Sequence, residues 1–258
     1  MQFSLALVLL HLLFFVVATP IAHGETSDVT PLRANPRRSV DDAGRRNKGT
    51  VCQCDLSKAQ MPQAPTPLPS PSTGLTLTHI AIGRGTQNYT CATNDSTTVP
   101  AAFGALASLF NVTCVDVDSP GLVAQLPGIA LNLPIPFTPA VDHAAENFFD
   151  YSGAHFFLDN TTPYFNLNTA THQYGSGAFK KLAASNAPAG SIVGPHNKGN
   201  GAVPWLKLTA DTAYADYTSQ TLKEVYRLNT AGGSPPPTCA GQQPKIFVPY
   251  SAEYWFYS

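Results

Sequence analysis

The stretch Leu75-Thr-Leu-Thr-His-Ile-Ala-Ile82 indicates the fold class, because the character of its side chains alternates along the chain. Leu75, Leu77 and Ala81 fall on one face of an extended chain, and two threonines fall on the other. A period of two residues is typical of a strand that is buried on one side.

Further runs rich in β-branched and aromatic residues, bounded by Gly, Pro, Asn or Asp, follow along the chain. Nine candidate strands cover residues 74–82, 87–92, 101–115, 153–158, 164–167, 191–194, 203–209, 222–230 and 245–257. Such a series predicts a single antiparallel sandwich or barrel. Helical patterns occur at 141–151 and 177–185 without a βαβ succession, so we expect a mainly β domain over 74–258 with one or two short helices.

The first residues predict export from the cytoplasm. Residues 5–18 are almost entirely apolar and are followed by Thr19-Pro20, which is typical of a secretory signal peptide. We place the signal peptide at residues 1–18, with cleavage after Ala18, and cleavage after Gly24 is the alternative. The sequence therefore predicts a secreted, extracellular protein.

Two segments separate this leader from the β domain. Residues 19–51 are rich in charge and contain the dibasic pairs Arg37-Arg38 and Arg45-Arg46. They indicate either a disordered pro-segment that is cut or an arm that is never cut. Residues 52–73 have a proline at every second or third position from 62 to 71, which favours an extended segment without a core of its own. We expect this Pro-rich segment to lie along the domain surface.

Charge and hydropathy argue against two classes of partner. Fifteen Lys and Arg stand against 16 Asp and Glu without a basic stripe, so we expect no nucleic-acid partner. The apolar run 122–137 contains Pro127, Pro134 and Pro136, which would break a helix. The run 5–18 is shorter than the roughly 20 residues that cross a bilayer, so we expect no membrane span.

Five cysteines fit an oxidising compartment, and their odd number leaves one thiol over. The chain between Cys91 and Cys114 has the pattern of a strand, a turn and a returning strand, so we predict that these two are paired. A second disulfide would join Cys239 to Cys54 or Cys52, although spacing alone does not fix the connectivity. A zinc site is not supported, because the CxxC spacing and a nearby histidine are both missing.

Four glycosylation sequons begin at Asn88, Asn94, Asn111 and Asn160. Glycan attachment favours an exposed turn of a secreted protein. Asn88 and Asn111 fall within predicted strands, so Asn94 and Asn160 are the better candidates. We predict that some of these sites carry glycan.

Five blocks of sequence carry a resemblance to a known family. They are residues 82–92 (IGRGTQNYTCA), 104–110 (GALASLF), 203–208 (VPWLKL), 224–239 (EVYRLNTAGGSPPPTC) and 250–257 (YSAEYWFY). Together they resemble the domain-of-unknown-function family 3455, which comprises secreted proteins of fungi and some bacteria. The resemblance runs from about Cys54 to the last residue. The family has no established activity, so the resemblance assigns no catalytic residue.

Fungal members of that family often carry the name malate dehydrogenase, which the residues do not support. A dinucleotide site needs G-x-G-x-x-G between a strand and a helix, so that the pyrophosphate meets the helix N-terminus. Here Gly83-Arg-Gly85 is followed by Asn88 at the third glycine position and then by strand-like residues. We expect no NAD-dependent activity and no cofactor.

The densest group of titratable side chains lies between positions 142 and 159. If a helix covers 141–151, His143, Glu146 and Asp150 share one face and are candidates to bind a divalent metal or to act as acid and base. The alternative is a solvated, charged helix face. Asp159 and His155 complete the catalytic candidates, and for His155 the alternative is a buried strand residue whose ring bonds a backbone carbonyl or a carboxylate.

Recognisable nucleophile motifs are missing, since the chain has no G-x-S-x-G, H-E-x-x-H, P-loop or S-x-x-K block. We interpret the chain as a secreted, non-catalytic β protein that associates with cell-wall polysaccharide, glycan or another extracellular surface. The alternative is a secreted hydrolase or lyase that acts on carbohydrate or a small ester. A pocket lined by convergent His and carboxylate groups would favour the enzyme.

Overall fold

The computed structural model describes residues 54–135, 150–214 and 221–258. Contacts divide the chain into the units Met1–Thr50 and Val51–Ser258, and all described residues belong to the second unit. The predicted signal peptide, the segment 19–51 and Cys52 lie outside the described residues.

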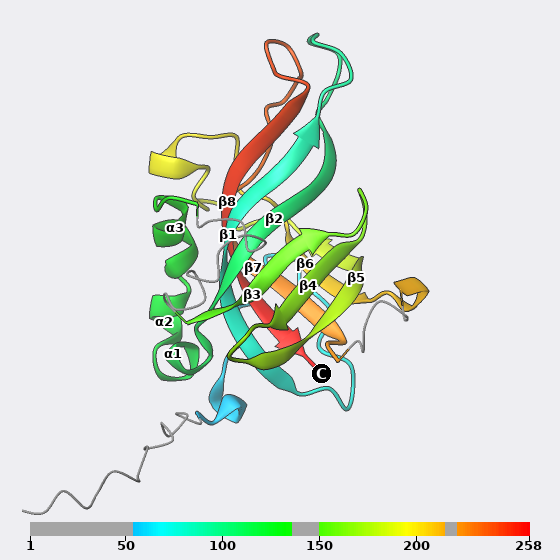
Figure 1. Ribbon diagram of the computed structural model, residues 1–258. Coiled ribbons are helices and arrows are strands. Elements are labelled where there is room, and N and C mark those ends of the chain that lie inside the picture. Colours follow the sequence, from blue (N-terminus) through cyan, green and yellow to red (C-terminus); the bar gives the residue numbers. More distant parts are fainter. Residues whose placement is uncertain (1–53, 136–149, 215–220) are drawn as a thin grey trace, which may run out of the picture. The chain divides into compact units, whose positions relative to one another are not determined.

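Eight antiparallel strands form a closed barrel, in which each strand pairs with the next and β8 pairs with β1 (Figure 1). The strands are β1 Leu77–Thr90, β2 Ala101–Asn111, β3 Tyr151–Phe157, β4 Pro163–Asn168, β5 Gln173–Ser185, β6 Trp205–Ala210, β7 Glu224–Gly232 and β8 Lys245–Tyr257. The prediction of a mainly β, antiparallel fold with few short helices is confirmed. The barrel has eight strands instead of about nine.

Strand β1 joins the predicted strands 74–82 and 87–92 into one, and Gly83 and Gly85 lie within it. A Cβ atom on Gly83 would lie 2.6 Å from the ring of Tyr254, and one on Gly85 would lie 1.8 Å from the carbonyl oxygen of Leu106. Glycine in a strand interior marks such a close approach of neighbouring groups. The Gly83-Arg-Gly85 stretch therefore lies in the middle of a strand and not in a strand-to-helix turn.

Three other local predictions were wrong. Residues 177–185, predicted as a helix, belong to β5, because hydrogen bonding to β4 and β6 outweighs their helix propensity. Residues 191–194 form no strand and lie in the connection between β5 and β6. The strand predicted over 101–115 ends at Asn111.

Short helices follow β2. They are α1 Thr113–Asp118, α2 Pro120–Val123 and α3 Leu126–Leu131. Three 3-10 turns lie elsewhere in the chain: η1 Leu56–Lys58 before β1, η3 Pro195–Asn197 after β5 and η4 Thr212–Tyr214 after β6. Helix α3 contacts β1, β7 and β8 from outside the barrel (Figure 1). Most of the helix predicted at 141–151 lies outside the described residues, and Tyr151 begins β3.

Within the described residues, no helix is both long and apolar enough to cross a membrane.

Aromatic side chains fill the barrel interior. Phe165 lies at the centre of this core, with its ring centroid 5.4 to 5.6 Å from those of Phe179, Tyr254 and Phe256. Their edge-to-face arrangement is the one that aromatic quadrupoles favour. The interior is therefore a packed core.

A second core lies on the outer wall of β1 and β6–β8, where it is covered by the Pro-rich segment and by α2 and α3. Tyr226 donates a hydrogen bond to the carbonyl oxygen of Pro69 at 2.7 Å, and the Lys207 ammonium donates to that of Ser70 at 2.7 Å. Lys207 also pairs with Glu224 at 3.0 Å, and both side chains are buried. The Pro-rich segment has no core of its own and shares this outer core with the barrel.

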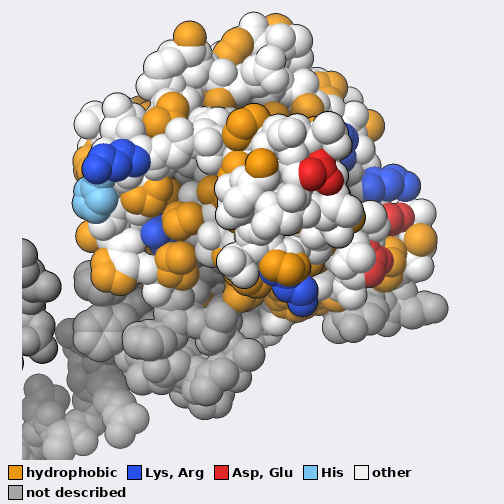
Figure 2. Space-filling view, turned by 90° about the horizontal axis from the view of Figure 1, so that it is seen from above, with side chains coloured by type: hydrophobic (Ala, Val, Ile, Leu, Met, Phe, Trp, Pro, Cys, Tyr) orange, Lys and Arg blue, Asp and Glu red, His pale blue; other side chains and the backbone are white. Residues whose placement is uncertain are grey.

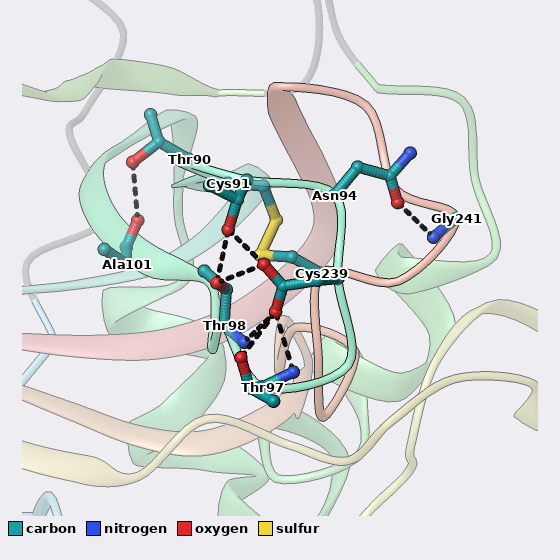
Figure 3. The surroundings of a disulfide bond; sticks show 10 residues. Thr90, Cys91, Asn94, Thr97, Thr98, Ala101, Cys239 and Gly241 are labelled. Carbon is teal, nitrogen blue, oxygen red and sulfur yellow. Dashed lines mark hydrogen bonds between the residues drawn. A yellow bond between two sulfur atoms is a disulfide. The ribbon is translucent and has the colours of Figure 1, made fainter.

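Two disulfides are present, as the cysteine content predicts, but the predicted connectivity was wrong. The pairs are Cys54–Cys114 and Cys91–Cys239. Cys91 follows the end of β1 and Cys114 follows the far end of the antiparallel β2, so the length of β2, roughly 35 Å, separates them. Figure 3 shows that Cys91–Cys239 joins the β1–β2 loop to the β7–β8 loop, beside the hydrogen bond from the Gly241 amide to Asn94.

Seen from above, the surface carries many hydrophobic side chains, and charged ones are sparse between them (Figure 2). Long-range electrostatic attraction of a highly charged partner is therefore weak at this face.

Candidate functional site

A pocket of about 590 Å³ lies on the outer wall of the barrel. One side is formed by α3 and its flanking residues, from Ala124 to Asn132, and the other by residues 188–192 of the β5–β6 connection. Trp205 of β6 and residues 229–231 of β7 form the floor. The volume is within the range of small-molecule sites.

The two sides of the pocket are fixed to each other. A Cβ atom on Gly128 would lie 2.4 Å from the side chain of Ile192, so the glycine allows α3 to approach the connection closely. The Asn132 carboxamide oxygen accepts a hydrogen bond from the His196 amide at 2.6 Å. On the barrel side, the Gly232 amide donates to the carbonyl oxygen of Ile192 at 2.8 Å. These contacts join α3, the β5–β6 connection and β7 around the pocket.

A bulge in β7 turns Asn229 toward the outer wall. The register of β7 with β8 shifts between Leu228 and Ala231, and Asn229 has a φ of 44°. Its carboxamide nitrogen donates to a carboxylate oxygen of Glu253 at 2.7 Å. A left-handed conformation at a residue other than glycine is strained, and such residues are concentrated at binding and active sites.

Two buried carboxyl groups lie behind this floor. Glu253 is fully buried, and its other oxygen accepts a hydrogen bond from the indole of Trp255. Burial raises the pKa of Glu253 to about 6, against the opposing effect of the Trp255 and Asn229 hydrogen bonds, and the neighbouring Asp116 adds to the increase. Burial also raises the pKa of Asp116 to about 6, and one of its oxygens has no partner among the described residues.

The pocket exposes more apolar than polar surface, and its described lining is uncharged. Five lining residues carry an amide or hydroxyl group: Gln125, Asn132, Ser191, Asn229 and Thr230. The side-chain nitrogens of Gln125, Asn132 and Asn229 and the hydroxyl of Thr230 already donate to protein groups, so the remaining amide oxygens and the Ser191 hydroxyl are the groups left for a ligand. Among the described lining residues none is a histidine or carries a charge. Phosphate and carboxylate ligands are usually held by Arg, Lys or His, so this lining favours a neutral ligand with both hydroxyl groups and an apolar face.

A family model described as "Protein of unknown function (DUF3455)" matches residues 71–258. The chain belongs to the DUF3455 family. No curated protein and no solved structure matches it. The pocket floor of this DUF3455 domain comes from two of the blocks that carried the resemblance, since Trp205 lies in residues 203–208 and Asn229 in residues 224–239.

His155 lies inside the barrel of the DUF3455 domain and not in the pocket. Its ring stacks on Phe165 with centroids 4.2 Å apart, and Nδ1 lies 3.0 Å from the carbonyl oxygen of Tyr164. Burial lowers its pKa to about 4, so the ring is neutral at pH 7 and Nδ1 donates the hydrogen bond. Packing and this one hydrogen bond are enough to explain a histidine at position 155.

Asp159 stabilises the turn between β3 and β4. One of its oxygens accepts hydrogen bonds from the amides of Thr161 at 2.6 Å and Thr162 at 2.8 Å, and the other accepts from the hydroxyl of Tyr214. The bond from Tyr214 and those from the turn hold the pKa of this carboxyl well below its usual value. Both oxygens of the Asp159 carboxylate thus accept hydrogen bonds from protein groups.

The proposed metal ligands are not brought together by the described part of the chain. His143 and Glu146 lie outside it, and Asp150 is the first described residue before β3. No group of three metal-ligating side chains occurs within residues 54–135, 150–214 and 221–258. A metal role for these residues stays a prediction.

The sequon asparagines differ in exposure. Asn94 and Asn160 lie exposed in the β1–β2 and β3–β4 loops. Asn88 lies within β1, where its carboxamide oxygen accepts from the hydroxyl of Thr86 at 2.8 Å, and Asn111 ends β2. The geometry is consistent with Asn94 and Asn160 as acceptors.

Proposed function

We propose that this DUF3455 protein is a secreted, non-enzymatic protein that binds a neutral carbohydrate, such as a segment of cell-wall polysaccharide, in the pocket between α3 and the barrel. The observation that carries the proposal is the lining, which combines amides, hydroxyls and apolar surface without a charged group among its described residues. Sugars present hydroxyl edges and C–H faces, and this lining complements both. The fixed walls favour binding, because less conformational freedom is lost.

The same lining argues against the hydrolase or lyase. Acid and base catalysis needs a titratable group within hydrogen-bonding reach of the substrate. The pocket residues that are described supply none, and the nearest raised-pKa group, Glu253, is fully buried behind Asn229. Both Glu253 oxygens are bonded to protein groups. A carboxylate so placed is suited to hold Asn229 and not to reach a sugar.

Secretion is supported by independent features. The apolar leader 5–18 has the pattern of a signal peptide, and two disulfides indicate an oxidising compartment. Four sequons occur in the same chain. These features together favour an extracellular site of action.

Tryptophan fluorescence offers a direct test, because the chain has only two tryptophans. Trp205 lines the pocket with 3% of its surface exposed, and Trp255, which does not line it, is 1% exposed. Titration with neutral glucan or chitin oligosaccharides should change the emission in a saturable way. Ala189→Phe places a ring at the pocket and should weaken binding at least tenfold, whereas Ala184→Phe on the exposed face of β5 is the matched control.

Equal binding by both variants, or no response to any neutral oligosaccharide, would overturn the proposal. Chromatography of the protein after incubation with the same oligosaccharides, or with a small ester, tests the alternative that the protein is a hydrolase or lyase. Release of shorter sugars or of an acid from an ester would establish an enzyme instead.

A further inference from the structure

The carboxamide groups around the pocket between α3 and the barrel turn their nitrogen atoms toward the protein. Gln125 and Asn132 each donate, at 3.0 Å, to the carbonyl oxygen four residues earlier in the chain. Asn229 donates to the carboxylate of Glu253 at 2.7 Å. A carbonyl oxygen or an ionised carboxylate only accepts, so each of these partners must face the nitrogen end of the carboxamide. The orientation of all three side chains is therefore fixed by the protein itself.

Two of the three carboxamide oxygens are left for a ligand. The oxygen of Asn132 already accepts a hydrogen bond from the His196 amide at 2.6 Å. The oxygens of Gln125 and Asn229 accept none from the described residues. Gln125 lies exposed on one side of the pocket, and Asn229 lies half-buried in its floor. A ligand in the pocket therefore meets an acceptor from the side and another from the floor.

Side-chain donors are scarce in the same lining. The Thr230 hydroxyl donates to the carbonyl oxygen of Val203 at 2.5 Å. The indole nitrogen of Trp205 is buried without a partner among the described residues, so it does not reach the pocket surface. The Ser191 hydroxyl is left as a group that can both donate and accept. Next to its apolar surface, the described lining thus offers a ligand mainly acceptors.

We propose that the pocket selects an unmodified hexose polymer, such as a glucan or a mannan, whose hydroxyl groups donate to the side-chain oxygens of Gln125 and Asn229. This inference rests on the carbohydrate binding proposed above and names the class of sugar. A hydroxyl group both donates and accepts, so a hexose supplies the donors that these oxygens need. Its C–H faces pack on the apolar part of the lining.

Two other classes of cell-wall sugar fit this lining less well. The acetamide carbonyl of an N-acetylated sugar and the carboxylate of a uronic acid only accept hydrogen bonds. In the pocket they would lose water and meet oxygen atoms, and a desolvated acceptor without a donor opposes binding. Hexose oligomers should therefore bind about fivefold or more tightly than N-acetylated oligomers of equal length.

Isothermal titration calorimetry of the full chain at pH 7 measures this preference. The probes are oligomers of equal length made of glucose, mannose, N-acetylglucosamine or galacturonic acid. The glucose or the mannose oligomer should have the lowest Kd, and the galacturonic acid oligomer should bind most weakly. Calorimetry does not depend on the tryptophan emission that tests carbohydrate binding as such.

Two substitutions of Gln125 separate an acceptor role from a donor role. Gln125→Glu removes the nitrogen with both of its hydrogens and keeps an acceptor oxygen, so the Kd for the hexose oligomer should stay within about twofold of the parent. Gln125→Met removes both polar ends and should weaken binding about fivefold. Gln125 is exposed, so neither variant should unfold the domain, which circular dichroism checks. Gln243→Met, exposed in the β7–β8 loop, is the matched control and should bind as the parent does.

Equal or tighter binding of the N-acetylglucosamine oligomer would overturn the inference and leave the carbohydrate binding itself standing. A Gln125→Met variant that binds as the parent does would overturn it as well. So would an equal loss in Gln125→Glu and Gln125→Met, because the nitrogen would then be the group that contacts the sugar. Absence of binding to every neutral oligosaccharide, or tightest binding of the galacturonic acid oligomer, would overturn the proposed function and this inference with it.

Discussion

Exchanging Lys207 for methionine removes one partner of the buried ion pair that attaches the Pro-rich segment to the barrel. The Lys207 and Glu224 side chains are 2% and 5% exposed, and their charged atoms lie 3.0 Å apart. Glu224 would keep only the two hydrogen bonds from Ser72, at 2.6 and 3.1 Å. Loss of one partner from a buried pair costs about 3–5 kcal/mol.

This loss corresponds to a decrease in Tm of roughly 6–20 °C for a domain of this length. Thermal unfolding followed by circular dichroism at pH 7 measures it. The double variant Lys207→Met, Glu224→Leu should recover most of the loss, because replacement of a whole buried pair by apolar groups is often neutral. A single variant whose Tm stays within about 2 °C of the parent would refute the reasoning.

The pH dependence provides a second check on the same pair. Burial acts to raise the pKa of Glu224, but hydrogen bonds from Ser72 and Lys207 and the charge of Lys207 outweigh it, so the pKa is lowered. A lowered pKa means that the stabilisation is present above the ordinary value of 4.5 and is lost as the pH falls through the folded-state pKa. The stability difference between parent and Lys207→Met should therefore shrink in acid.

Three further outcomes are expected. Because burial raises the pKa of Glu253 and of Asp116 to about 6, the parent should lose stability as the pH rises from about 4.5 to 7. Glu253→Gln should flatten the dependence of Tm on pH across this range, and an unchanged slope would contradict the role given to Glu253. His155→Ala should lower the free energy of unfolding by roughly 1–3 kcal/mol in urea titrations, since it removes a packed ring and its hydrogen bond. A stable variant that loses ligand binding would instead indicate a functional role for His155. Replacing Cys91 and Cys239 by serine opens a loop with a sequence separation of 148 residues, which should lower the free energy of unfolding by about 5 kcal/mol in the chain-entropy model. Peptide mapping that finds Cys91 joined to another cysteine would refute the pairing.

The fold class could be predicted because alternation of side chains is a local signal. Residues 75–82 show it, and most of them form β1. Residues 177–185 were misassigned because the lysine and alanine residues there favour a helix in isolation, and only pairing with β4 and β6 makes them a strand. Strand pairing is a long-range property that a local pattern does not contain.

The pocket was not predictable for a related reason. Its lining comes from helix α3, from the β5–β6 connection and from the bulge at Asn229, which are far apart in the sequence. The residues predicted from the sequence as site candidates are titratable, whereas the described lining is uncharged. The usable signal was the pair of resemblance blocks that contain Trp205 and Asn229.

Closure of the barrel by β8 determines the order in which this domain can assemble during synthesis. Strand β1 pairs with β2 on one side and with β8 on the other, so its second edge stays unpaired until residues 245–257 have been made. An open edge with unpaired N–H and C=O groups readily pairs with another chain. The nascent domain must therefore pass through a long interval in which an aggregation-prone edge is exposed, and contacts between the first and the last strand make its folding slow.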